Sequence, residues 1–396
     1  MILGASRSQV PLIRAAKRLG CYTVVVSTPG SWPGFAEADE SCFTDISDPE
    51  QVLRAAKEKK TDAITTCCMD TGVEAVGRVC SAMKLPGISL EAARTARNKY
   101  LMKQAFEKGG VQCARFLPVR NEHELEKAVE SLSFPLVLKA VDLMGSRGIY
   151  FCRDPEEARR NYPVVRSSSG ASLILAEEFL EGVLFDGAAI VQHGKMVFSM
   201  LDNSLLYHKG NIPTSIGHSL PFRLEEEAGA KAREQMELVI RAMGFDNTAL
   251  DFDLMYTKGR VCVIEVNARA GACCLSELAG WQKSVDYYEI LVRLALGEDV
   301  GQLLSGTPHA GACIARTLFS ERTGTVRSIQ LPALTPDPGA EILDLSLDVT
   351  KGSEVRRYTN GRDRIGQLIV SAPDPETCDR QVEKILSGMQ IRVDSE

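Results

Sequence analysis

Apolar positions in the first hundred residues alternate between strand-like and helix-like spacing. A short strand over 1–6 and a β-branched strand over 21–27 flank residues 9–19, whose apolar side chains recur at helical intervals before Gly20. The alternation continues through a helix over 48–59, a strand over 62–68 and a helix over 71–83. This βαβαβα order predicts a parallel sheet covered by helices on both faces.

Two further regions follow, with different patterns. Between residues 96 and 306, strands and helices alternate less regularly and include a hairpin whose arms meet at Lys258-Gly259. Between residues 307 and 396, many short β segments precede a helix over 375–386 and a last strand. We therefore expect an α/β and α+β chain with domains at 1–95, 96–306 and 307–396. The opening strand has only three residues before Gly4, which leaves open whether the N-terminus is complete.

The amino-acid composition disfavours several classes of protein, namely nucleic-acid-binding, membrane and zinc-binding proteins. The 396 residues have 46 basic and 52 acidic side chains, a net charge of −6, which argues against a nucleic-acid partner but not against a nucleotide. No apolar run reaches the roughly 20 residues that cross a bilayer, and no signal peptide precedes the first helix. The twelve cysteines lack zinc-site spacing. We expect a cytoplasmic enzyme without a membrane partner.

The hairpin carries the strongest candidate chemistry. Asp253 lies on its first arm, and Glu265 and Asn267 alternate on the second, so the last two point to one face. Two carboxylates and an amide oxygen are ligands that suit Mg²⁺, or Mn²⁺. Arg269 continues the same face and is suited to bind an anion beside the metal. The alternative is a surface hairpin with polar outward positions.

A lysine and a glycine-rich loop form a second candidate. Lys139 ends the apolar strand 134–140, and Gly145, Ser146 and Arg147 follow in a loop closed by Gly148. Backbone N–H groups of such a loop can approach phosphate oxygens. The alternative is a lysine that reaches solvent before an ordinary turn.

Two weaker signals flank this loop. Lys99 begins a predicted helix over 98–109, where a lone lysine is usually a solvated charge. Further on, strand 173–180 ends in Glu177, Glu178, Phe179 and Leu180, whose backbone could bind an adenine edge, although by itself the pattern favours an ordinary edge strand.

Together, the order and approximate spacing of these four signals resemble those of the ATP-grasp superfamily. The resemblance spans roughly residues 1–300 and includes a Rossmann-like domain before the ATP-grasp fold, with a lid subdomain at about 112–182. The tail from Gly311 to about Val393, with RTLFSERTGTV and GRDRIGQLIV, is similar to the small β-rich C-terminal domain of bacterial L-amino acid ligases.

The resemblance implies specific roles. Lys99 and Lys139 would bind the ATP phosphates beneath the loop of Gly145, Ser146 and Arg147, and Glu177 to Leu180 would hold adenine. Asp253, Glu265 and Asn267 would hold two Mg²⁺ ions, Arg269 would stabilise an acyl phosphate, and His218 would border the substrate pocket. One departure is Leu184, where relatives carry a ribose-binding glutamate; Asp186 is a candidate substitute. The resemblance is also compatible with a homodimer as the assembly.

The implied reaction joins a small-molecule carboxylate to an amine, with a dipeptide as one product. One alternative is an ATP-grasp carboxylase or carbamoyl-phosphate enzyme that uses bicarbonate. A second is a nucleotide-binding protein without catalysis. A third, a dinucleotide-dependent oxidoreductase, is disfavoured because Gly4 opens no G-x-G-x-x-G motif.

Overall fold

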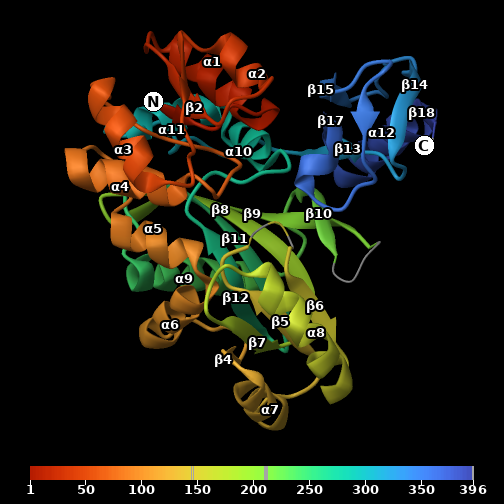
Figure 1. Cartoon of the computed structure of the whole chain (residues 1–396). Helices are drawn as coiled ribbons and strands as arrows, with labels where there is room; N and C mark the ends of the chain where they lie inside the picture. The colour runs from red at the N-terminus through yellow and green to blue at the C-terminus, as the bar shows by residue number, and fades with distance from the viewer. Residues whose placement is uncertain (144, 146, 209–212, 395–396) are drawn as a thin grey trace. The chain divides into compact units, whose positions relative to one another are not determined.

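Two compact units make up the computed structural model, which describes residues 1–394 except 144, 146 and 209–212. The first unit comprises 1–200, 224–271 and 288–305, and the second comprises 201–223, 272–287 and 306–396. Figure 1 shows the course of the chain and its helices and strands.

A three-stranded parallel sheet opens the first unit. Its strands are β1 (Ile2–Leu3), β2 (Val24–Ser27) and β3 (Glu40–Phe43), in that order. The helices of this segment are α1 (Val10–Arg18), α2 (Pro33–Glu37), α3 (Pro49–Glu58), α4 (Val73–Met83) and α5 (Leu90–Arg97). Asp48 accepts hydrogen bonds from two N–H groups at the start of α3, so the predicted helix begins at its N-cap.

The strand predicted over 62–68 is wrong. The segment makes isolated parallel bridges only, from Thr65 to Ile2 and from Cys67 to Ala270. Cys68 has φ 55, a left-handed conformation that ends the extended run. The segment therefore pairs at single residues with β1 and with the chain just after β12, instead of adding a full strand to a sheet.

A four-stranded antiparallel sheet has the order β4-β7-β5-β6. Its strands are β4 (Phe116–Val119), β5 (Leu136–Ala140), β6 (Ile149–Cys152) and β7 (Ile174–Glu178), and helices α7 (Glu122–Ser131) and α8 (Pro155–Ser168) contribute to the same apolar core. Every residue of β5, including Lys139 at its end, is buried.

The hairpin of the first unit is formed by β11 (Thr248–Thr257) and β12 (Arg260–Asn267), and β11 also pairs with β8 (Val183–Gln192). Helices α5, α6 (Lys99–Gly109) and α9 (Glu226–Met243) pack against one another and against β12. The last helix of this unit is α11 (Tyr287–Ala295), shorter than the predicted 283–296 because left-handed Ser284 follows α10.

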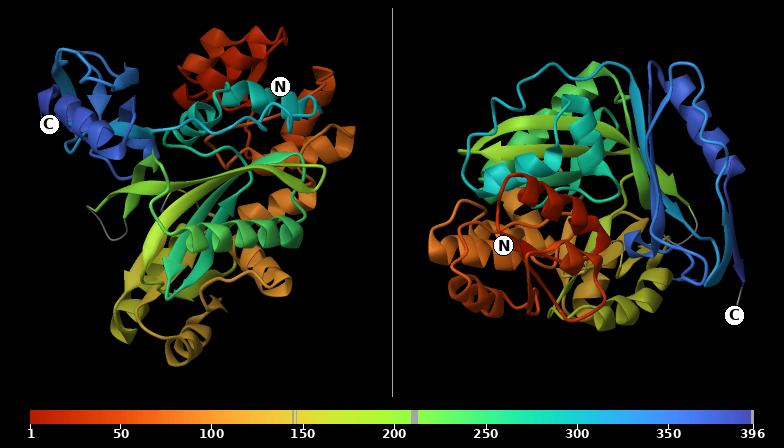
Figure 2. Two further views of the ribbon diagram at one scale, coloured as in Figure 1. Left: turned by 180° about the vertical axis from the view of Figure 1, so that it is seen from behind. Right: turned by 90° about the horizontal axis from the view of Figure 1, so that it is seen from above.

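The second unit contains a run of antiparallel strands in the order β9-β10-β13-β17-β15, and a smaller sheet in the order β16-β14-β18. Helix α12 packs along β13 and β17, as Figure 2 shows in its right-hand view. The elements are β9 (Lys195–Tyr207), whose residues from 201 onward belong to this unit, β10 (Thr214–Leu220), α10 (Leu275–Lys283), β13 (Ala312–Phe319), β14 (Gly324–Gln330), β15 (Glu341–Leu347), β16 (Glu354–Val355), β17 (Arg364–Ala372), α12 (Pro375–Gly388) and β18 (Gln390–Asp394).

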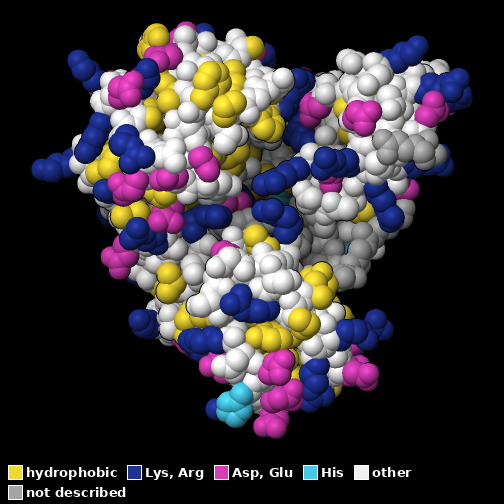
Figure 3. Space-filling view, in the orientation of Figure 1, with side chains coloured by type: hydrophobic (Ala, Val, Ile, Leu, Met, Phe, Trp, Pro, Cys, Tyr) yellow, Lys and Arg dark blue, Asp and Glu magenta, His cyan; other side chains and the backbone are white. Residues whose placement is uncertain are grey.

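The mixed α/β and α+β fold class expected from the sequence is confirmed. Among the described residues, no helix combines the length and the apolar character that crossing a bilayer requires. Figure 3 shows one face of the molecule, on which both basic and acidic side chains are exposed.

Phe252 supports the hairpin from behind. It is fully buried on β11, between Asp251 and Asp253, so its ring lies on the opposite face of the strand. We expect Phe252→Ala to lower the free energy of unfolding by about 3–5 kcal/mol, because it leaves a cavity in the core. Urea denaturation followed by circular dichroism measures this effect.

Phe43→Ala is the matched control for Phe252→Ala. Its ring is 63% exposed and contacts Phe35 edge-on, so we expect a loss of about 1 kcal/mol or less. A similar loss in both variants would show that the hairpin does not depend on the buried ring.

Candidate active site

Four carboxylates crowd one face of the β8–β11–β12 sheet. Asp253 lies directly opposite Glu265 on β12 and opposite Asp186 on β8, and Asp251 lies opposite Asn267. Directly opposed residues have their Cβ atoms roughly 4.5–5.5 Å apart on the same face. The register of the hairpin therefore brings the three predicted metal ligands together.

These oxygens fit a divalent cation. Burial and the neighbouring Asp186, Asp251 and Glu265 raise the pKa of Asp253 well above its ordinary value, while Arg269 partly offsets them. Asn267 is 7% exposed, and its Oδ1 accepts no hydrogen bond from any described residue. Crowded carboxylates and an unsatisfied amide oxygen are relieved together by a hard cation with oxygen ligands.

Lys99 contacts one of these carboxylates. It begins α6, whose N-cap Asn98 accepts hydrogen bonds from the N–H groups of Tyr100 and Leu101. The Lys99 Nζ lies 2.8 Å from Glu265 Oε1 and donates to the Leu143 carbonyl at 2.9 Å. The side chain is buried, so the lysine belongs to the site and is not a solvated surface charge.

Lys139 approaches the same face from β5. Its Nζ lies 2.8 Å from Glu177 Oε2 on β7, and both side chains are buried. Burial alone would lower the pKa of Lys139, but Glu177, Glu265 and Asp253 outweigh it and raise the pKa. Lys139 is therefore a buried cation paired with Glu177, and the charges of Glu265 and Asp253 add to the stabilisation of its charged form.

Arg269 is held between two aspartates. Its Nε donates to Asp70 Oδ1 at 2.8 Å, and its Nη1 donates to Asp251. Burial would lower the guanidinium pKa, but Asp70 and Asp251 raise it, so the group stays charged. Within the described residues its Nη2 donates no hydrogen bond, which leaves N–H groups for an anionic ligand.

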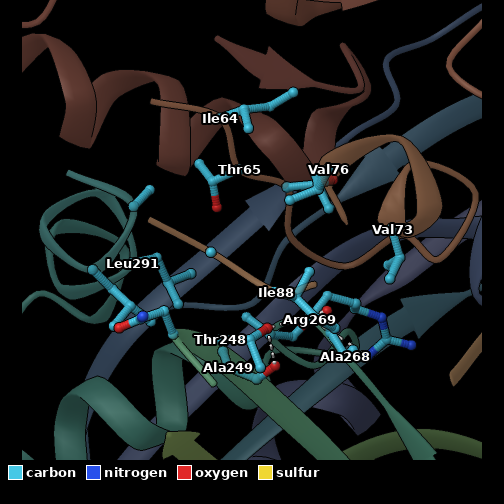
Figure 4. Close-up of a pocket in the computed structure, with 16 residues that line it drawn as sticks. Ile64, Thr65, Val73, Val76, Ile88, Thr248, Ala249, Ala268, Arg269 and Leu291 are labelled. Atoms are coloured by element: carbon cyan, nitrogen blue, oxygen red, sulfur yellow. Dashed lines mark hydrogen bonds between the residues drawn. The ribbon is translucent and has the colours of Figure 1, made fainter. Parts of the chain in front are cut away.

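A small cavity lies beside Arg269. It measures about 40 Å³ and is lined by Ile64, Val73, Thr248 and Leu291, among others. Figure 4 shows the guanidinium group directed away from the middle of these residues. A water requires roughly 10–15 Å³ of such space, so the cavity has room for about three waters and not for a substrate.

The loop after β5 is only partly described, and Ser146 lies outside the described residues. Gly145 and Gly148 have φ 67 and 65, left-handed conformations that favour glycine. A Cβ at Gly145 would meet no atom of the residues that the structure describes, whereas one at Gly148 would approach Ala140. Arg147 belongs to the same turn.

The end of β7 offers fewer free groups than its sequence suggests. Glu178 Oε1 accepts from Arg115 and from the Ser133 N–H, and the Phe179 N–H donates to the Pro135 carbonyl. The Phe179 ring is 44% exposed, and Leu180 is half-buried. Glu177 Oε1 accepts no hydrogen bond from a described residue, so it can accept one from a ligand.

His218 belongs to the second unit and lies on β10. Its Nδ1 is 2.8 Å from Asp202 Oδ1, and both side chains are buried. A carboxylate partner fixes the ring orientation of a histidine. The other predicted site residues belong to the first unit.

Sequence reasoning missed three residues of the site: Lys103, Asp70 and Asp251. Lys103 follows Lys99 by one helical turn, a spacing that puts both on one face of α6 and could have revealed it. Asp251 lies two residues before Asp253 on β11, so strand alternation puts both side chains on one face and could have revealed Asp251. Asp70 follows the misassigned strand, so no local pattern pointed to it.

Two protein families match the chain. The ATP-grasp domain family matches residues 96–273, and the family described as L-amino acid ligase C-terminal domain 2 matches residues 316–394.

Solved and curated proteins agree with these matches. The crystal structure of phosphoribosylglycinamide synthetase from Anaerococcus prevotii is 31% identical, covers 99% of this chain and 98% of its own, and has a TM-score of 0.83. That of L-amino acid ligase from Bacillus licheniformis is 19% identical, covers 100% and 98%, and has a TM-score of 0.80, a likeness of fold. Alanine–anticapsin ligase of Bacillus subtilis is 27% identical over 64% of this chain and 55% of its own length.

Glu177→Gln tests the buried charges. The substitution leaves the ammonium groups of Lys139 and Lys103, at 2.8 and 3.6 Å, without their carboxylate, so we expect the free energy of unfolding at pH 7 to fall by about 3 kcal/mol. Burial opposes ionisation of Glu177, but Lys103 and Lys139 lower its pKa. The stabilisation is therefore complete above an ordinary glutamate pKa of about 4.3 and decreases as pH falls below it. Urea denaturation across this range measures it.

Glu178→Gln is the control for that measurement. Its partner Arg115 is 65% exposed, so we expect a change of about 1 kcal/mol or less. An equal loss in the two variants, or an unchanged pH dependence in Glu177→Gln, would contradict the charge assignment.

Proposed function

Because the chain belongs to the ATP-grasp superfamily of ATP-dependent ligases, we propose that it phosphorylates a carboxylic acid and couples the resulting acyl phosphate to an amine. The match of residues 316–394 to the L-amino acid ligase C-terminal domain supports an amino acid as the acid and a dipeptide as the product. We also propose that the protein acts in the cytoplasm and forms a homodimer.

One observation carries the proposal. The candidate ligands Asp253, Glu265 and Asn267 lie close together on the hairpin. Lys99 contacts Glu265 directly, and the charges of Glu265 and Asp253 favour the charged form of the buried Lys139. Oxygen ligands beside buried cations are what a metal-bound polyphosphate requires, because the metal and the lysines neutralise different phosphate oxygens. Neither the oxygen ligands without the lysines nor the lysines without the oxygen ligands would be specific for a metal-bound polyphosphate.

Activation of the acid follows from these charges. A carboxylate does not react with an amine at neutral pH because its oxygen is a poor leaving group, whereas a phosphate leaves readily. Mg²⁺ or Mn²⁺ on Asp253, Glu265 and Asn267 would supply positive charge to the phosphoryl oxygens of ATP. Lys139 and Lys99 bind the remaining phosphate oxygens and orient the γ-phosphoryl group towards the acid.

Coupling depends on Arg269. Attack of the amine on the acyl phosphate places negative charge on the former carbonyl oxygen, and the Nη2 group of Arg269 is available to donate to it. Asp70 and Asp251 hold the guanidinium plane in place before the substrate arrives, so the donor needs no reorientation during the reaction. The bond between the carbonyl carbon and the phosphate oxygen then breaks, phosphate leaves with the electron pair, and the proton of the amine passes to the phosphate or to water.

Glu265→Gln should abolish the release of ADP at saturating ATP and substrates, because it removes a carboxylate ligand and the partner of Lys99. A coupled ADP assay at several Mg²⁺ concentrations measures the effect. Glu237→Gln, on the exposed side of α9, has the same charge change and should retain wild-type turnover. Wild-type turnover in Glu265→Gln would refute the metal assignment.

A screen of substrates tests the reaction class. We expect ADP release only when an acid and an amine are both present, and mass spectrometry should detect the amide of the two. Pairs of L-amino acids form the first panel, and bicarbonate with single amines forms the second. ADP release that depends on bicarbonate, without an amide of an organic acid, would replace the proposal with a carboxylase.

A further inference from the structure

Lys103 is a buried cation for which the proposed reaction has no use. It lies one helical turn after Lys99 on α6, and only 1% of its surface is exposed. A lysine is almost never buried so completely unless it is paired, because the loss of hydration is costly. Its contacts therefore indicate what it does.

The Lys103 ammonium contacts both sheets that carry the site. Its Nζ lies 3.6 Å from Glu177 Oε2, the same oxygen that Lys139 Nζ contacts at 2.8 Å. It also donates to the Val263 carbonyl at 3.5 Å, two residues before the candidate metal ligand Glu265 on β12. The Lys103 side chain thus contacts both the sheet that contains β5 and β7 and the candidate metal-binding hairpin of β11 and β12.

The backbone of β12 at Val263 has a further hydrogen bond. The Val263 N–H donates to the Gln112 carbonyl at 2.7 Å, so Val263 is hydrogen-bonded through both its N–H and its carbonyl group. Lys103 also lies over the ring of Phe106, 5.8 Å from its centroid, which limits the movement of its stem.

Charge balance suggests the purpose of this arrangement. Lys139 and Glu177 alone form a neutral pair, which would attract a polyphosphate only weakly. With Lys103 the three side chains have one positive charge in excess. Burial opposes the ionisation of Glu177, and Lys103 and Lys139 both lower its pKa. Because Lys103 shares the Glu177 carboxylate with Lys139, part of the positive charge of Lys139 is left for a ligand.

We propose that Lys103 is a positioning residue that offsets the charge of Glu177, and so leaves the Lys139 ammonium free to bind the nucleotide triphosphate. It also fixes the distance between Lys139 and the metal-binding hairpin. The inference rests on the proposed function, because it assigns the phosphates to Lys139. It adds a third lysine, which touches neither nucleotide nor metal, to the determinants of ATP affinity.

Lys103→Met tests the inference, since methionine keeps much of the length of the side chain without its charge. We expect the Kd for ATP with Mg²⁺, measured by calorimetry, to rise at least about tenfold, as for the loss of a buried charge near a charged ligand. The KM for ATP should rise in parallel, and the KM values for acid and amine should stay within about twofold. Lys108→Met, exposed on the same helix, should match the wild type.

A second substitution separates charge from packing. Lys103→Met with Glu177→Gln removes one positive and one negative charge and restores the excess of one positive charge. We expect this double variant to bind ATP about threefold or more tightly than Lys103→Met alone, a coupling that independent packing defects would not produce. If Lys103→Met does not fold, Lys103→Gln takes its place in the same comparison.

Two results would overturn the inference alone. One is a folded Lys103→Met that binds ATP as tightly as the wild type, and the other is a double variant that binds more weakly than either single variant. By contrast, a wild-type protein that binds ATP but couples no acid to any amine would overturn the proposed function and leave the Lys103 result standing.

Discussion

The crowding of carboxylates on the β11–β12 hairpin is the constraint on which the rest of the site depends. Asp251, Asp253 and Glu265 are brought together by strand register, and Asp186 is added by the neighbouring strand. Such a face is unstable without positive charge nearby. Lys99 on α6 pairs with Glu265, and Arg269, just after β12, pairs with Asp251. The carboxylates of Glu265 and Asp253 also favour the charged form of Lys139 on another sheet.

Local spacing was sufficient to find the centre of the site. Alternation along a strand places Glu265 and Asn267 on one face, and a polar residue within an apolar strand marks Lys139. Asp253 was found as the carboxylate on the facing arm of the same hairpin, whereas the roles of Lys99 and Glu177 came from the resemblance to a family, because a single charged residue has no periodicity of its own. The geometry brings all of these first-unit residues together, but their chemical roles remain predictions.

The remaining features depend on contacts between distant segments. Asp70 reaches Arg269 across 199 positions of sequence, which no local pattern reveals. The segment 62–68 has the β-branched composition of a strand, yet it is limited to single bridges by the conformation of Cys68 and by partners from two different parts of the chain. At the end of β7, the Phe179 N–H and the Glu178 carboxylate are already used within the protein, which leaves Glu177 as the available acceptor.

The contact between Lys99 and Glu265 has a consequence for the order of events. The same carboxylate oxygen holds the ammonium group at 2.8 Å and is a candidate to hold a divalent ion, and it cannot serve both at that distance without strong repulsion between the two cations. A divalent ion held by Glu265 would take the place of the Lys99 ammonium at that oxygen, and Lys99 would then need a new anionic partner. A triphosphate bound together with the ion would provide that partner, so binding of the metal and binding of the nucleotide would favour each other.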